Sequence, residues 1–275
     1  MIKISVIMSV YNNEKTVSRA IESIINQSFN YWEFIICDDN SSDNTYRILE
    51  EYKNKYENIK IFKNERNMGL AYSLNKCIEL SRGEYIARQD GDDYSDYNRL
   101  KEQLDFLEKN KEFDFVGSNV YLFDENGVWG ERVFLEKPDK KDFLRMDFVD
   151  GARFCHPSIM FRRKALIEVG KYRVAKETRR GQDYDLYMRM YAKGMKGYNI
   201  QKKLLYYYEG DQSVKRISFM HRINSVILRY KGFKALGLLP KGLLVVLKPI
   251  LVGLFPKKIL KLYKRMKYSK SVELR

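Results

Sequence analysis

Cysteine, proline and histidine are scarce in this chain. Its 275 residues include 3 Cys, 5 Pro and 2 His, and glycine, at 16, is not abundant either. Cys37, Cys77 and Cys155 are too few and too scattered for a disulfide framework or a cysteine-based metal site. So little proline and glycine also argues against a disordered or fibrous chain. We therefore expect a folded protein of the reducing cytosol, without a secretory signal, because residues 1–6 read as a strand.

Glycine-rich phosphate-binding motifs are also missing. The chain contains neither G-x-G-x-x-G nor G-x-x-x-x-G-K-[S/T], which excludes the usual dinucleotide-binding and P-loop cradles. A protein that handles a diphosphate without such a loop depends on a metal ion. What the chain does have is material for a large core, with 44% hydrophobic and 14% aromatic residues. Its length suits one large domain, or one domain plus an appendage.

Acidic residues almost vanish in the C-terminal part. Residues 215–275 hold 16 Lys and Arg but a single acid, Glu273, whereas the first 214 residues carry 35 basic and 35 acidic side chains. The whole net charge of +15 therefore lies in the last 61 residues. Such asymmetry suggests a tail with an anionic partner of its own, attached to an ordinary globular domain.

The N-terminal half alternates predicted strands with predicted helices. Apolar runs predict strands at 3–10, 33–37, 59–62 and 84–87, and helical periodicity covers 14–27, 44–56 and 70–81. This order predicts a mostly parallel sheet with helices on both faces. In such sheets ligands bind beyond the carboxyl ends of the strands, so residues 9–12, 38–40 and 90–93 should share one edge.

Beyond residue 100 the pattern changes. Asn126-Gly127 reads as a hairpin turn between two predicted strands. The predicted elements of this part are a helix at 100–109, the hairpin strands 115–123 and 128–135, a strand at 157–161, helices at 163–169 and 183–192, and a strand at 204–208.

Asp90-Gly91-Asp92-Asp93 places three carboxylates within four residues. Such groups repel one another unless a cation lies among them, and ligands that are all oxygen favour Mg²⁺ or Mn²⁺. The ion would bridge to a diphosphate and neutralise its charge. The same segment also fits a solvated acidic turn before a helix, but its position at a strand end, beside two other polar segments, favours the metal site.

Three further residues are ambiguous when each is taken alone. Asp39 follows a strand and could accept a hydrogen bond from a base or a ribose, but an Asx turn would use the same residue. Asp183 opens a predicted helix and could be a general base, or could simply cap that helix. His156 is either a metal ligand or a hydrogen-bonded structural residue.

Together these segments resemble family 2 glycosyltransferases in their order and spacing. The segments that match are 5–12, 38–43, 67–70, 83–87, 90–93, 156–163 and 181–186. The resemblance covers residues 1–213. It implies a GT-A fold, a nucleotide-diphospho-sugar donor, a divalent metal and inversion at the anomeric carbon.

The resemblance also implies a role for individual residues. Asp183 matches the catalytic base, Asp39 matches the residue that reads uracil, and Asp90 begins the D-x-D pair. The residues expected to bind the nucleotide-sugar are Ser9, Tyr11, Asp39, Arg66 and Asp90, and those expected to bind the metal are Asp92, Asp93 and His156. The family usually has Glu before the base, where this chain has Gln182.

Residues 235–255 are strongly apolar but do not read as one membrane-spanning helix. About 20 uninterrupted apolar residues are needed to span a bilayer, whereas two lysines interrupt this run and Pro240 and Pro249 break it. We expect amphipathic helical pieces that lie on an anionic membrane surface, with the basic cluster 257–267 after them. Packing on the domain and a transmembrane hairpin are alternatives. Nucleic acid is not an expected partner, because Leu, Val and Ile runs suit lipid better.

The sequence thus predicts a GT-A domain at 1–213 and a basic, amphipathic, membrane-associating segment at 214–275. We expect an inverting glycosyltransferase that uses Mn²⁺ or Mg²⁺ to move a sugar from a UDP-sugar to an acceptor hydroxyl. The expected acceptor is a lipid-linked glycan of bacterial surface polysaccharide, met at the cytoplasmic face of the cell membrane. The rivals are an inactive GT-A scaffold, which the intact acidic residues disfavour, and a sugar nucleotidyltransferase, which would need a glycine-rich N-terminal loop.

Overall fold

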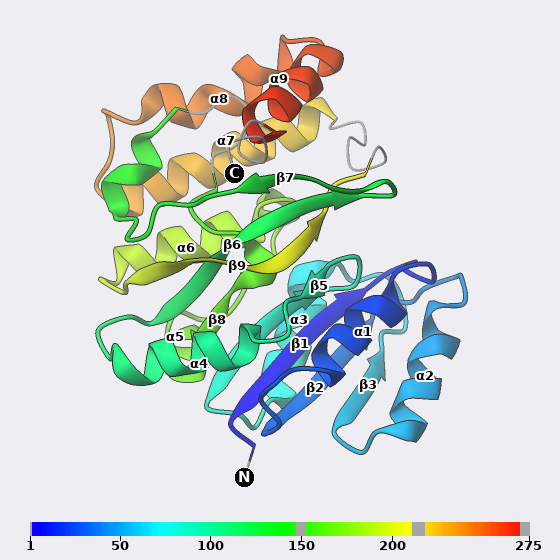
Figure 1. The fold of residues 1–275 in the computed structure, drawn as a ribbon. Coiled ribbons are helices and arrows are strands. Elements are labelled where there is room, and N and C mark those ends of the chain that lie inside the picture. Colours follow the sequence, from blue (N-terminus) through cyan, green and yellow to red (C-terminus); the bar gives the residue numbers. More distant parts are fainter. Residues whose placement is uncertain (1, 147–151, 211–217, 270–275) are drawn as a thin grey trace.

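The computed structural model describes residues 2–146, 152–210 and 218–269, and Figure 1 shows their arrangement. The strands are β1 (Ile4–Val10), β2 (Trp32–Asp38), β3 (Ile59–Lys63), β4 (Tyr85–Asp90), β5 (Tyr94–Ser95), β6 (Phe115–Asp124), β7 (Gly127–Arg132), β8 (Met160–Arg162) and β9 (Gly197–Tyr208). The helices are α1 (Val17–Ile25), α2 (Thr45–Lys55), α3 (Leu70–Leu80), α4 (Arg99–Lys109), α5 (Arg163–Glu168), α6 (Gln182–Ala192), α7 (Phe219–Ala235), α8 (Leu243–Gly253) and α9 (Lys257–Ser269).

The strands form one mixed sheet in the order β3-β2-β1-β4-β8-β6-β9-β5, with β7 paired to β6. β3, β2, β1 and β4 run parallel, as the alternating pattern predicts. β8 pairs antiparallel with both β4 and β6, and β9 pairs parallel with β6. The chain fills the sheet from β1 outward to β3 and then returns to place β4 on the other side of β1. Because β1 and β4 flank this reversal, the ligand crevice is expected at their carboxyl ends.

β1 is buried on both faces of the sheet. Ile4, Val6 and Met8 pack in one apolar cluster with side chains of α1 and α4. Ile7 packs on the opposite face in a second cluster, which contains side chains of α3 and α6. This alternation is the period of two that a strand imposes, and burial on both sides explains why the strand is mostly apolar.

Several strands differ from their predicted bounds. β9 begins at Gly197, seven residues before the predicted start, and β7 ends at Arg132 rather than at 135. Gln201-Lys202-Lys203 places three polar residues inside β9, and they interrupt the apolar pattern that predicts a strand. In the structure Lys202 pairs with Glu102 of α4 at 2.7 Å and Lys203 pairs with Glu131 of β7, so the charges lie on a strand whose register with β6 shifts at this point.

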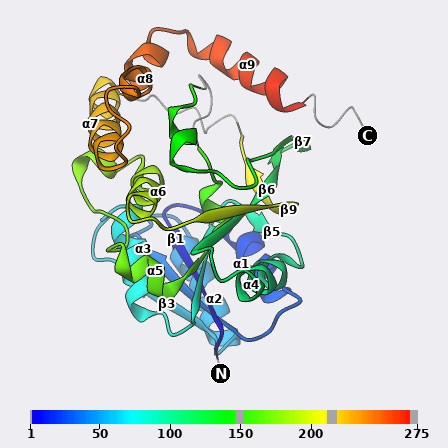
Figure 2. The ribbon, with the colours of Figure 1, turned by 90° about the vertical axis from the view of Figure 1, so that its left-hand side faces the viewer.

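The C-terminal helices pack on the rest of the chain. Phe233 of α7 and Val246 of α8 are almost wholly buried and belong to the same apolar cluster as Leu186 of α6. α9 lies beside β7, and its Tyr268 is buried against side chains of β6. Figures 1 and 2 show these three helices at the end of the molecule that carries β7, away from β3 and α2. Within the described residues, no helix combines the length and apolarity needed to cross a bilayer.

Candidate active site

The carboxyl ends of three parallel strands meet at one edge of the sheet, as the sequence predicts. Ser9 of β1 is the register partner of Asp90 of β4, and Val10 is the partner of Asp38 of β2. The backbone N–H of Asp39 donates to the carbonyl of Val10 at 2.8 Å, which joins the first two polar segments directly. This edge is the frame on which the candidate site is built.

Asp90, Asp92 and Asp93 form a compact group of carboxylates after β4. One oxygen from each lies within 4.8 Å of the others. Asp93 is 1% exposed, and its Oδ1 accepts from the backbone N–H of Tyr208 at 2.7 Å, while its buried Oδ2 has no partner among the described residues. Burial and the charge of Asp90 raise the pKa of Asp92 to about 6, and burial raises the pKa of Asp93 well above its ordinary value. An orphaned buried oxygen in an all-oxygen donor set fits Mg²⁺ or Mn²⁺.

Asp183 stands in the first turn of α6 and faces a cavity of about 450 Å³. Asp90 lines the same cavity, so the structure brings together two acidic residues that are 93 positions apart. Burial raises the pKa of the Asp183 carboxyl. A carboxylate in such a setting binds protons more readily than an ordinary Asp, which suits a general base.

Four arginines surround these acids. Arg88, Arg132, Arg179 and Arg180 all line the cavity. Arg88 is 1% exposed and forms an ion pair with Asp90, two positions along the same strand. Arg132 is also buried, whereas Arg179 and Arg180 are exposed. Cations and carboxylates that line one cavity can neutralise the charges of a diphosphate and orient a polar substrate.

Sequence reasoning missed these four arginines. Arg88 carried a local signal, because residues two apart on a strand lie on the same face and Arg88 precedes Asp90 by two. The pair Arg179-Arg180 directly before the motif at 181–185 was a second signal. Arg132 had none, since only the pairing of β7 with β6 brings it to the cavity.

Asp39 is held by neighbouring N–H groups rather than exposed at the edge. It is 3% exposed, and its carboxylate accepts from the side chain of Asn64 and from the backbone N–H groups of Met68 and Gly69, each at 2.8 Å. These bonds fix the turn before α3. Arg66 is exposed on this turn and its Nε lies 3.5 Å from the sulfur of Met68.

Ser9, Tyr11 and His156 occupy different surroundings. Ser9 is half-buried at the end of β1, and Tyr11, two residues on, is exposed. His156 lines the cavity with Asp90, and its Nε2 lies 2.7 Å from the hydroxyl of Tyr172. Burial lowers the pKa of His156 well below its usual range, so the ring is neutral at pH 7. The group of possible metal ligands found among the described residues contains the three aspartates without His156, whose role as a ligand stays a prediction.

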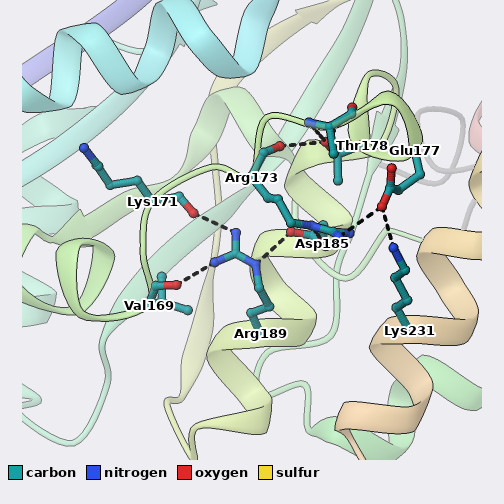
Figure 3. Close-up of polar contacts among 9 residues, drawn as sticks. Val169, Lys171, Arg173, Glu177, Thr178, Asp185, Arg189 and Lys231 are labelled. Carbon is teal, nitrogen blue, oxygen red and sulfur yellow. Dashed lines mark hydrogen bonds and ion pairs between the residues drawn. The ribbon is translucent and has the colours of Figure 1, made fainter.

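A buried polar network anchors the start of α6 (Figure 3). Asp185, two residues after Asp183, accepts from Arg173 and from Arg189, at 2.7 Å in each case. Arg189 also donates to the carbonyls of Val169 and Lys171, both at 2.6 Å. The first turn of α6 is therefore tied to the segment that leads into it.

The network continues to α7. Glu177 pairs with Arg173 at 3.2 Å and with Lys231 of α7 at 2.7 Å (Figure 3). The hydroxyl of Thr178 donates to the carbonyl of Arg173 at 2.6 Å. Since Arg179 and Arg180 follow directly, the same contacts fix the loop that presents these two arginines to the cavity.

Comparisons with known proteins agree with this arrangement. The family model described as glycosyl transferase family 2 matches residues 5–170. The Bacillus subtilis protein that bears the name glycosyltransferase EpsE is 39% identical over 272 residues, which is 98% of this chain and 96% of the relative. The Escherichia coli protein WfaP, named as a UDP-Glc:alpha-D-GlcNAc-diphosphoundecaprenol beta-1,3-glucosyltransferase, is 29% identical over 84% of this chain and 88% of its own.

Among solved structures, residues 1–349 of Staphylococcus aureus TarS in complex with UDP-GlcNAc superpose with a TM-score of 0.68. The match has 20% sequence identity and covers 87% of this chain and 72% of that one. At this identity the likeness establishes the fold, and the curled, mostly parallel sheet is that of GT-A glycosyltransferases. The family model spans more than half of the chain and one relative aligns along almost all of it; the chain belongs to glycosyl transferase family 2.

Proposed function

We propose that this glycosyltransferase moves a sugar from a UDP-sugar to an acceptor hydroxyl, with inversion at the anomeric carbon. The observation that carries the proposal is the shared cavity, in which Asp183 of α6 faces Asp90 of β4 among four arginines. A site for this reaction needs a base on the acceptor side and positive charge on the diphosphate side. The residues present supply both.

Asp183 is the base in this proposal. The acceptor oxygen forms its bond to the anomeric carbon from the face opposite the nucleotide, the bond from that carbon to the diphosphate oxygen breaks, and the hydroxyl proton passes to the Asp183 carboxylate. Burial, which raises the pKa of Asp183, strengthens it as a base. A positioned base contributes about 10²- to 10⁴-fold in rate.

The departing diphosphate is stabilised by positive charge. Arg88, Arg179 and Arg180 lie in the cavity where that charge develops. Asp92 and Asp93 would hold Mg²⁺ or Mn²⁺, which when bound supplies further neutralisation of the diphosphate. The unpartnered Oδ2 of Asp93 supports this assignment.

Asp39 is proposed to recognise the uracil, with Ser9, Tyr11 and Arg66 around the nucleoside. A carboxylate offers about four lone-pair positions, and three N–H groups already donate to Asp39. One position is left for the imide N–H of uracil. The same three bonds hold the turn that carries Arg66, so Asp39 would both bind the base and shape its pocket.

A lipid-linked glycan is the proposed acceptor, met at the inner face of the cell membrane. WfaP is named for a diphosphoundecaprenol-linked acceptor. In this chain, Ile259, Leu262, Tyr263 and Met266 recur at helical spacing along α9 and are each at least half exposed. An outward apolar stripe on a basic helix is typical of segments that lie in a membrane interface. We keep 1–213 and 214–275 as the catalytic and membrane-associating parts.

A release assay tests this function. The protein is incubated with a panel of UDP-, GDP- and dTDP-sugars and Mn²⁺ or Mg²⁺, and free nucleoside diphosphate is measured with and without EDTA. The proposal predicts slow UDP release from one UDP-sugar that EDTA abolishes. Release of pyrophosphate would identify a nucleotidyltransferase instead, and failure to bind any donor in the panel would contradict the proposal.

A further inference from the structure

A second cavity adjoins the candidate active site. Its volume is about 300 Å³, and it shares Arg132 and Ala152 with the cavity that contains Asp183. Its other walls come from the segment after β7, from Arg145 and Arg153, and from Lys267 and Tyr268 of α9. It therefore lies between the acidic site and the helix that carries the outward apolar stripe.

The second cavity is strongly basic. Arg132, Arg145, Arg153 and Lys267 all line it, and within the described part of the chain no acidic residue does. Arg145 is exposed at the mouth of this cavity and pairs with Asp142 at 3.0 Å. Guanidinium and ammonium groups gathered around one small space can donate several charge-assisted hydrogen bonds to a multiply charged anion.

Aromatic rings and backbone groups hold this basic wall in place. The guanidinium of Arg132 lies 4.9 Å from the ring centre of Phe134 and 5.9 Å from that of Tyr268. Arg153 donates to the carbonyl of Arg145 at 3.3 Å. Stacked and tethered guanidinium groups lose less freedom when they bind phosphate, so the wall is organised for an anion before one arrives.

The position of the cavity identifies the anion. The donor diphosphate belongs at the end of β4, beside Arg88 and the three aspartates. An acceptor whose hydroxyl reaches Asp183 while its lipid stays in a membrane under α9 must pass its linking phosphates between these two places. Arg132 touches both cavities, and Lys267 lies on α9 itself.

We infer that the basic cavity binds the diphosphate group that links the acceptor sugar to its lipid. The inference rests on the proposed function and extends it by naming how the acceptor is held. A volume of about 300 Å³ is at the lower end of the roughly 300–1,000 Å³ usual for ligand pockets. It suits a phosphate head group rather than a whole lipid, and the lipid would continue along α9.

Direct binding measurements test the inference. Farnesyl diphosphate, at concentrations where it stays monomeric, is titrated by calorimetry into protein already saturated with UDP and Mn²⁺, so that the donor site is filled. Arg145→Gln and Arg153→Gln are compared with Lys234→Gln, an exposed position on α7 that lines neither cavity. UDP affinity and the thermal midpoint are measured for every variant.

Arg145→Gln and Arg153→Gln each remove charge-assisted hydrogen bonds to phosphate. Each substitution should therefore weaken the binding of farnesyl diphosphate by about 10-fold or more. UDP affinity should stay within about twofold of the wild type, and Lys234→Gln should change neither value. Arg153→Lys, which keeps the charge, should restore part of the affinity.

The remaining outcomes would overturn the inference in different ways. If UDP binds but farnesyl diphosphate does not, the proposed function survives and the acceptor site is wrong. Equal losses for UDP and farnesyl diphosphate would assign the cavity to the donor. If inorganic diphosphate binds as tightly as farnesyl diphosphate, or vesicles with phosphatidylglycerol compete fully, the cavity serves a free anion or a phospholipid head group instead.

Discussion

Asp183 and Asp185 lie two positions apart on α6 and serve different purposes. Asp183 faces the cavity, whereas Asp185 is 5% exposed and receives hydrogen bonds from two arginines. Both fit the sequence description of an acid in the first turn of a helix. The sequence distinguished the two aspartates only through the resemblance to family 2 glycosyltransferases. The hydrogen-bond partners of Asp185 lie in a loop and in the next turn of α6, and no local pattern predicts them.

Asp185→Asn should disturb catalysis without touching the substrate. The substitution removes the negative charge that pairs with both Arg173 and Arg189, whose side chains are only 32% and 25% exposed. We therefore expect the free energy of unfolding to fall by about 2–3 kcal/mol. The turnover rate should fall about tenfold, because the first turn of α6 no longer holds Asp183 in place.

Asp105→Asn is the matched control for this variant. Asp105 pairs with Lys101 at 2.6 Å on the surface of α4, where such a pair contributes well under about 1 kcal/mol. Urea unfolding and initial-rate kinetics check both variants. If Asp185→Asn were as stable and as active as Asp105→Asn, the network in Figure 3 would not position the base.

Not every site residue could be found at the residue scale. The three aspartates at 90–93 are neighbours in sequence, so their cluster could be predicted from their spacing. Asp39 was predicted at the edge of the sheet, but its three N–H donors could not be, since they depend on how the turn before α3 folds back. Arg132 reaches the cavity only through strand pairing, a long-range contact that leaves no local pattern.

At the scale of elements, α9 shows how an amphipathic helix can turn its apolar side outward. Arg265 pairs with Asp124 at 3.2 Å and Lys264 pairs with Glu209, so these two basic residues contact the body of the protein. Leu262 and Met266 stay exposed on the helix. The amphipathic pattern was predictable, but which side faces the protein depends on these two acidic partners.

The double substitution Leu262→Gln, Met266→Gln should weaken membrane binding. Each side chain buried in the lipid interface contributes about 1.5 kcal/mol, so we expect about a tenfold loss per side chain in affinity for vesicles that contain phosphatidylglycerol. Co-sedimentation with vesicles measures this. Ile167→Gln, at an exposed apolar position on α5, is the control and should bind like the wild type. Unchanged binding of the double variant would remove α9 from the membrane contact.

The bounds of β9 could not be predicted, because they depend on ion pairs between its lysines and other elements. Lys202 and Lys203 interrupt the apolar pattern of a strand, yet they belong to β9, where each pairs with an acidic residue beside the strand. The two halves of the molecule therefore differed in predictability. Strand β1 is mostly apolar and is buried on both faces, whereas β9 carries charges at its centre.

At the scale of the whole molecule, the sheet explains why these distant segments form one site. Parallel strands bring residues 9, 38 and 90 to one edge. β8, which is antiparallel to both β4 and β6, joins this part of the sheet to β6, whose Phe115 stacks on Tyr187 of α6, the helix that carries Asp183. The alternation of strands and helices allowed the first half of this arrangement to be predicted. The C-terminal helices could not be placed, because their apolar residues suited a membrane, a neighbouring core or both. In the structure α7 and α8 each pack some apolar side chains in the core, while others, such as Met220 and Leu244, stay exposed.

The central claim is that Asp183 acts as the base of sugar transfer, and one comparison tests it most directly. Turnover of the UDP-sugar found in the release assay is measured for the wild type, Asp183→Asn and the surface control Asp105→Asn, together with UDP affinity. We expect Asp183→Asn to lose about 10²- to 10⁴-fold in rate while UDP affinity stays within about twofold. Because burial raises the pKa of Asp183, the wild-type rate should also fall on acidification at a higher pH than for an ordinary Asp. Turnover of Asp183→Asn within tenfold of the wild type would contradict the account.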